Sequence, residues 1–192
     1  ITDEDIAKIK AVPGVEQVRE DITVNLQYIT RPGQKKYVGT LQGFNPFQKP
    51  KLLAGTINTP LGSKQLLLPE GYLASLGFTS AQDAIGKKVT LAVAKPVTVQ
   101  SPTTPPGQPT APVAPAIESF TEEFTIAAVL QKPTTSQPGT ELYMFTSQAD
   151  AHMLNDVATL GTPNYRKYVF VNVRIKDGEN ATVLTEAQDK IK

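Results

Sequence analysis

The chain has 192 residues, and 40% of them are hydrophobic, so it can form one sizeable domain or two small ones that share a core. Nineteen basic side chains and eighteen acidic ones leave a formal charge of +1, which disfavours nucleic-acid binding. There is no cysteine and only one histidine, which excludes disulfides, thiolate catalysis, iron–sulfur ligation and structural zinc. Because it begins at Ile1 without a methionine or a secretory segment, we expect a fragment of a longer protein.

The first elements are predicted from local patterns. Thr2 and the acidic residues 3–5 are typical of a helix start, and Ile6, Ile9 and Val12 then share one face before Pro13 and Gly14 end the helix. Alternating apolar residues predict strands at 22–28 and 37–41, joined by a turn at 31–34. We therefore expect a short amphipathic helix followed by a hairpin.

The middle of the chain is more broken. Residues 43–62 hold six glycines or prolines and are predicted to be irregular. A buried strand is expected at 65–68 and a helix at 70–76, followed by a helical turn that Ser80 caps and a strand at 89–93.

Residues 96–117 differ from their surroundings. They contain seven prolines and neither a charged nor an aromatic side chain. Proline lacks the donor that a sheet needs, and the segment has little apolar area to bury, so we expect an extended surface loop. The alternative is a proline-rich ligand for an aromatic groove.

The last third returns to regular patterns. Strands are predicted at 124–130, 142–145 and 169–175, the last being the clearest alternation in the chain. Ser147 and Asp150 have the spacing of a capping box, which opens a helix. Its expected inward residues are Ala149, Met153, Leu154 and Val157. A final helix carries Leu184, Ala187, Gln188 and Ile191 at helical spacing.

The order of elements predicts an α+β fold. Helices at both chain ends adjoin strong strands, so we expect a terminal α+β lobe built from residues 1–40 plus 164–192. Its sheet would contain the strands at 22–28 and 169–175. Residues 41–163 would form an inserted, mostly β lobe that carries the proline-rich loop, and both termini would lie on one side.

No catalytic, cofactor or metal site is predicted. His152 lies inside a predicted helix, the acids at 3–5 are explained by a helix start, and Glu122 and Glu123 flank a strand. A hydrolase that uses His152 or the glutamate pair is the least favoured hypothesis. Tyr72, Phe78 and Tyr143 could line a ligand pocket, but aromatic residues beside leucines are usually core. Partner-binding residues stay unknown.

Several short motifs follow one another in the order of a known family. The segments are residues 9–18 (IKAVPGVEQV), 38–46 (VGTLQGFNP), 53–56 (LAGT), 67–77 (LLPEGYLASLG), 85–91 (IGKKVTL), 124–130 (FTIAAVL) and 173–181 (VRIKDGENA). Together they resemble the MacB-like periplasmic core domain of bacterial ABC-transporter permeases of the MacB, FtsX and lipoprotein-release type. Thr56 stands where the family has arginine, and Ala128 where it has glycine.

The resemblance implies a non-catalytic domain on the extracytoplasmic side of a bacterial cell membrane, held between the first two transmembrane helices of a permease. Its partners would be those helices, a cytosolic ATPase subunit and a possible second permease copy, and the isolated fragment would be monomeric. It implies two lobes, one built from both chain ends. The alternative is a secreted or surface-anchored binding module that uses the proline-rich loop for recognition.

Overall fold

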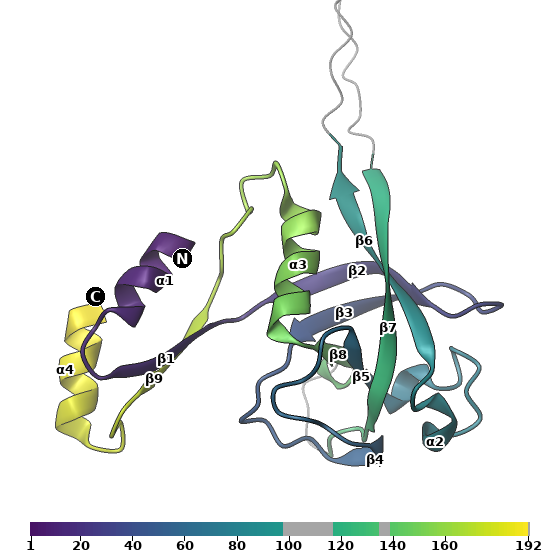
Figure 1. Cartoon of the computed structure of the whole chain (residues 1–192), viewed down its shortest axis with the longest axis horizontal. Helices are drawn as coiled ribbons and strands as arrows, with labels where there is room; N and C mark the ends of the chain where they lie inside the picture. Colours follow the sequence, from purple (N-terminus) through teal and green to yellow (C-terminus); the bar gives the residue numbers. More distant parts are fainter. Residues whose placement is uncertain (98–116, 135–138, 192) are drawn as a thin grey trace, which may run out of the picture. The chain divides into compact units, whose positions relative to one another are not determined.

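The computed structural model describes residues 1–97, 117–134 and 139–191 (Figure 1). The chain divides into two compact units. Unit 1 contains residues 1–22 and 164–192, and unit 2 contains residues 23–163. Both units contain helices and strands, as the predicted α+β class requires.

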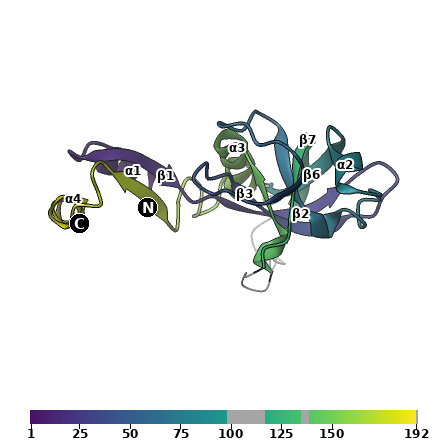
Figure 2. The ribbon, with the colours of Figure 1, turned by 90° about the horizontal axis from the view of Figure 1, so that it is seen from below.

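Unit 1 contains two helices and one pair of strands, which come from both ends of the chain. These elements are α1 (Asp3–Lys10), β1 (Val15–Glu20), β9 (Val171–Ile175) and α4 (Ala181–Ile191). The strands are antiparallel neighbours, with Val18 opposite Val173 (Figures 1 and 2). The side chains buried in this unit are few: Ile6, Val18, Ile22, Tyr168 and Ala187.

Helix α1 begins at a capping box, as predicted. The Asp5 amide donates to Thr2 Oγ1 (3.3 Å) and the Thr2 amide donates to Asp5 Oδ2 (2.9 Å). Acidic residues occupy the first turn and lysines the last, which matches the helix dipole at both ends. Gly14 follows with φ +90°, a conformation that lets the chain reverse into β1.

Unit 2 holds the other seven strands, two α-helices and two short 3₁₀ helices. In chain order these are β2 (Thr23–Thr30), β3 (Tyr37–Gly43), β4 (Leu52–Gly55), β5 (Gln65–Pro69), η1 (Glu70–Tyr72), α2 (Ala81–Ala84), β6 (Lys88–Pro96), β7 (Ile117–Leu130), η2 (Thr140–Leu142), β8 (Tyr143–Thr146) and α3 (Gln148–Thr159).

Six of these strands close into a ring. The hydrogen-bonded neighbours run β7, β5, β8, β3, β2, β6 and back to β7, which pairs with β6 along its first part and with β5 along its last part. Strand β4 lies outside the ring, paired with β7 alone. Each strand of the ring therefore has two neighbouring strands, although some segments, such as residues 93–96 of β6, pair on one side only.

The core of unit 2 lies where the strands of the ring and α3 meet. Helix α3 packs against β6, β3 and β2. Large side chains that are fully buried come from nearly every strand: Ile29, Leu41, Leu66, Leu67, Leu68, Leu91, Phe124, Ile126, Met144 and Leu154. Leu91, Phe124 and Ile126 occupy positions that the alternating patterns select, whereas Leu66–Leu68 form a consecutive run and Ile29 lies beyond the predicted strand.

Several predictions are confirmed and others are wrong. The hairpin at 22–28 and 37–41 exists, but its strands belong to the seven-stranded sheet, so the prediction that 22–28 and 169–175 share a sheet is wrong. The reason is that β2 pairs with β3 and β6, whereas β9 pairs with β1, a strand that the sequence patterns did not reveal. Residues 23–40 accordingly cluster with unit 2.

Three smaller differences concern local structure. The predicted helix at 70–76 is a 3₁₀ turn at Glu70–Tyr72 followed by further turns, and a short strand, β4, interrupts the segment expected to be irregular. In α3, Leu154 is buried as predicted, but Ala149 is exposed and Ala151 is buried instead.

Candidate functional site

Unit 1 contains an open groove between α1, β9 and α4, with a volume of about 620 Å³. Six of the residues that line it are apolar: Ile1, Ile9, Val12, Val171, Val173 and Ile191. Three charged residues, Asp5, Lys8 and Lys190, also line it. We call it the terminal groove, because Ile1 and Ile191 lie on it together.

Helical and strand periodicity produce this groove. Asp5, Lys8, Ile9 and Val12 recur at intervals of three or four residues, so they share one face of the first helical segment. Val171 and Val173 are two residues apart on β9 and therefore point to the same face of the sheet.

The N-terminal end of the chain is held next to the segment that leads into β9. The Ile1 ammonium group donates to the Tyr168 carbonyl (3.1 Å), and the Tyr168 amide donates to the Ile1 carbonyl (2.8 Å). Thr2 forms a further antiparallel bridge with Lys167. Ile1 and Ile191, the ends of the described residues, line the same groove, which agrees with the prediction that both ends lie on one side.

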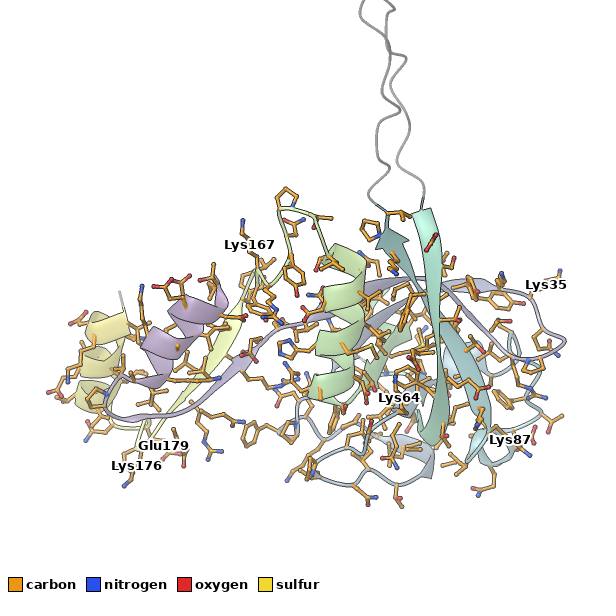
Figure 3. The ribbon with its side chains drawn as sticks, turned by 45° about the horizontal axis from the view of Figure 1, so that its top comes forward. Lys35, Lys64, Lys87, Lys167, Lys176 and Glu179 are labelled. Carbon is orange, nitrogen blue, oxygen red and sulfur yellow. The ribbon has the colours of Figure 1, made fainter. Side chains whose placement is uncertain are left out.

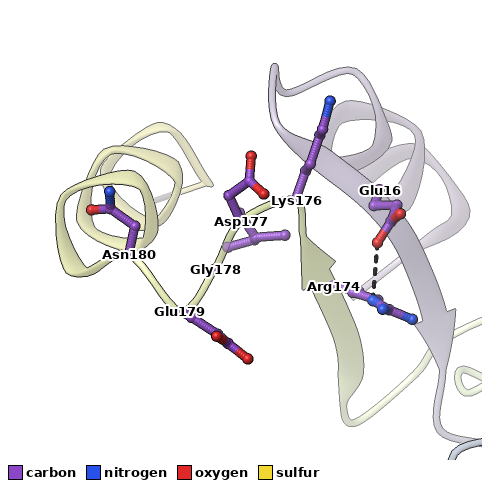
Figure 4. A pocket seen from close by; sticks show the side chains of 8 residues that line it. Glu16, Arg174, Lys176, Asp177, Gly178, Glu179 and Asn180 are labelled. Atoms are coloured by element: carbon purple, nitrogen blue, oxygen red, sulfur yellow. Dashed lines mark ion pairs between the residues drawn. The ribbon is translucent and has the colours of Figure 1, made fainter.

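A second, polar pocket of about 730 Å³ lies at the turn between β9 and α4 (Figure 4). Arg174 Nε is 2.9 Å from Glu16 Oε2 on one side, and Asp177 and Asn180 lie on the turn. Both partners of the ion pair are about half exposed, so the pair contributes little to stability. In Figure 3 the labelled side chains of Lys176 and Glu179 extend away from the ribbon, which is typical of a solvated surface.

The glutamates considered for hydrolysis are each paired with a lysine. Glu122 Oε2 is 3.0 Å from Lys64 Nζ, and Glu123 Oε2 is 3.0 Å from Lys88 Nζ. Because they are consecutive on β7, their side chains point to opposite faces of the strand. The structure therefore does not bring these two carboxyl groups together as an acid–base pair. His152 lies in α3, as predicted, and is half-buried there.

The acidic residues at the start of the chain have structural partners. Tyr168 donates its hydroxyl proton to Asp3 Oδ1 (3.0 Å), Glu4 is 3.0 Å from Lys8 Nζ, and Asp5 completes the capping box. Hydrogen bonds from Thr2, first of all from its amide, lower the pKa of Asp5 below its ordinary value. Across the described residues, no three His, Asp or Glu side chains are grouped so that they could hold a metal ion.

Two of the three aromatic residues considered as pocket residues are buried in unit 2. Tyr72 donates its hydroxyl proton to the Val38 carbonyl (3.2 Å), and burial raises the pKa of that phenol. Phe78 is covered by the Arg31 guanidinium group, whose central carbon lies 4.4 Å from the ring centroid. Tyr143 is half-buried on β8. The interpretation of Tyr72 and Phe78 as core residues is confirmed.

The proline-rich segment lies almost wholly outside the described residues. The structure describes its ends, Pro96 and Val97 on one side and the backbone of Ile117 on the other, where β6 and β7 pair. None of the helices in the described ranges combines the length and the apolar character needed to cross a membrane.

The architecture is thus a two-unit α+β fold, with a terminal unit formed by both chain ends and a closed ring of strands formed by the segment between them. It is similar to the extracellular domain of the ABC-type transporter YknZ from Gram-positive bacteria, with a TM-score of 0.53 and 17% identity over 97% of this chain and 78% of that one. The periplasmic region of MacB from Actinobacillus actinomycetemcomitans matches at a TM-score of 0.49 and 13% identity, over 97% of this chain and 70% of that one.

At the level of the fold, the resemblance to MacB-like periplasmic core domains is confirmed. No protein-family model matches the sequence, and the comparison with curated proteins gives no match either.

The sequence did not reveal the terminal groove. Its residues come from four separate places in the chain, and the signal for it was divided between a helical repeat at 5–12 and the alternation at 171–175. Only the pairing of β9 with β1 brings these patterns into one unit.

Proposed function

We propose that this chain is the extracytoplasmic domain of a bacterial ABC-transporter permease, and that it couples ATP-driven motion of the membrane helices to an external substrate or partner. The observation that carries the proposal is the fold shared with the extracellular domain of YknZ over 97% of this chain. ATP hydrolysis belongs to a separate nucleotide-binding subunit or domain. In this proposal the chain itself catalyses no reaction.

In this proposal unit 1 is the membrane-proximal part, and movement of the membrane helices is transmitted to the domain at the terminal groove. Ile1 and Ile191 both line that groove, so helices joined to the two ends would pull on one structural unit. Few side chains of unit 1 are fully buried, which makes this unit the more deformable of the two. Helices α1 and α4 would then shift against β9 when the membrane helices move.

The first test is membrane topology. Because these 192 residues contain no cysteine, Thr56→Cys adds one labelling site to them, at a residue that is exposed in the structure. The variant is made in a parent permease whose cysteines outside this chain have been replaced, and that cysteine-free parent is the control. We expect a membrane-impermeant maleimide to label it in intact spheroplasts. Labelling only after the cells are lysed would contradict the proposal.

The second test addresses coupling. We expect a bifunctional maleimide between Lys8→Cys and Lys190→Cys, which both line the terminal groove, to reduce partner-stimulated ATPase activity about 5-fold or more. The matched control joins Lys88→Cys to Glu123→Cys, whose side chains meet at 3.0 Å across two paired strands of the ring. Equal activity of both cross-linked proteins would show that the terminal groove does not transmit motion.

A further inference from the structure

Strand β4 is the one strand in the described part of unit 2 that has a single partner strand. Each strand of the ring has a partner strand on both sides over part of its length. Strand β4, against which helix α2 also packs, pairs with β7 on one side and with no described strand on the other. An open edge presents unpaired amide and carbonyl groups, and it is the feature to which extended peptides add as a new strand.

The side chains around this edge include exposed apolar groups. Leu52 packs against the core cluster that includes Phe44, Leu67 and Leu130, whereas its neighbour Leu53, at an irregularity in the pairing with β7, is 45% exposed. Phe47, in the connection that leads into β4, is 58% exposed. The short length of β4, its irregular pairing and the flanking lysines limit indiscriminate strand addition, and the exposed Leu53 and Phe47 add apolar contact surface.

Three lysines flank the edge, and one carboxylate lies beside them, that of Glu70, which accepts from the Lys132 amide (2.9 Å). Lys49 and Lys51 precede β4 and are exposed, and the Gln131 amide donates to the Lys51 carbonyl (2.9 Å), which places exposed Lys132 beside them. None of these three lysines forms an ion pair with another described residue. The edge therefore combines apolar side chains with three lysines that are available for acidic groups.

We propose that the outer edge of β4 binds an extended segment of a partner protein in which acidic and apolar side chains alternate. Main-chain hydrogen bonds to β4 would supply the affinity, Leu53 and Phe47 would contact the apolar side chains, and the lysines would select the acidic ones. A second copy of this chain suits the edge poorly, because each copy would bring the same three lysines. The proposal rests on unit 2 alone and does not depend on the proposed transport function.

The site is short because Gly55 ends the strand. It has φ +82°, and a Cβ at this position would lie 2.7 Å from the Ala128 Cα atom of β7. The backbones of β4 and β7 therefore approach closely at this point, and the chain leaves the sheet after four residues. A four-residue edge is suited to a weak, reversible partner rather than to a permanent one.

The test is a titration of the whole isotope-labelled chain, followed by amide chemical shifts. The probe is a six-residue peptide that alternates glutamate and valine, and we expect shifts at Leu52–Gly55 with a Kd of about 0.1–1 mM at low salt. The same peptide with N-methylated amides on its pairing edge should not bind. A peptide that alternates lysine and valine should bind about tenfold more weakly or worse.

Two variants separate the contributions of charge and apolar contact. Lys49→Glu combined with Lys51→Glu should weaken binding of the glutamate–valine peptide about tenfold, whereas Lys35→Glu combined with Lys167→Glu, the same charge change elsewhere (Figure 3), should not. Leu53→Ala should also weaken binding, and Leu160→Ala, at another exposed leucine, should not.

Three results would overturn the proposal. One is the absence of shifts at Leu52–Gly55, and another is equal affinity for the acidic and basic peptides. The third is a shift of these amides with protein concentration in the absence of peptide, which would show that a second copy occupies the edge.

Discussion

Helix α1 offers a matched pair of isoleucines for testing how unit 1 is held together. Ile6 is 3% exposed, whereas Ile9, one turn further, is half-buried and lines the open terminal groove. Replacing a buried isoleucine by alanine removes its transfer free energy and leaves a cavity, which together cost about 2–5 kcal/mol. Ile9→Ala opens no closed cavity, because the groove is already accessible to water, so we expect it to cost about 1 kcal/mol.

The assay is native-state hydrogen exchange of the β9 amides in both variants, with guanidinium used to resolve local from global unfolding. Because unit 1 has few buried side chains, Ile6→Ala should accelerate exchange throughout β9, and Ile9→Ala should accelerate it far less. The two variants delete the same atoms from the same helix, so propensity effects cancel. Equal acceleration in both, or a cost under about 0.5 kcal/mol for Ile6→Ala, would refute the packing argument.

Three further changes probe single interactions. The pKa of Asp5 is lowered in the folded chain, so the stabilisation that its carboxylate gives α1 is fully present above the ordinary pKa of 3.8. This stabilisation is lost as the pH falls through the lower pKa of the folded state. Asp5→Asn should remove this part of the acid sensitivity, measured by circular dichroism from pH about 5 to 2. Asp150→Ala should cost about 1–3 kcal/mol in urea unfolding, because it leaves the Lys64 amide without the carboxylate that lies 2.8 Å away. Gly55→Ala should cost about 1–3 kcal/mol, owing to its positive φ and the close approach of β7, and an unchanged unfolding midpoint would contradict that reading.

Helix starts were predictable because their chemistry is local. Thr2, Ser80 and Ser147 each cap a helix in the structure, and in each case the hydroxyl accepts from the amide three residues later. The alternating strands of the ring were recognisable for a similar reason, since one face of each strand is buried and selects apolar residues.

Strand β1 was missed because its own sequence carries little signal. Among its six residues only Val15 and Val18 are apolar, and they are three apart rather than two. A bulge between Val15 and Gln17 shifts the register, so the two valines do not follow a simple alternation. The strand exists because β9, more than 150 residues later, pairs with it.

The open edge of β4 could not have been located from the sequence, because it is a property of the whole set of pairings. Strand β7 has 14 residues and contacts β6, β5 and β4 along its length, yet its first half contains mostly polar side chains, and only the second half alternates clearly. Once the first half of β7 pairs with β6, the ring closes and each of its strands has two neighbouring strands. Which strand keeps an unpaired edge therefore depends on which strands pair with β7. The proposed interaction surface results from this topology rather than from a sequence motif.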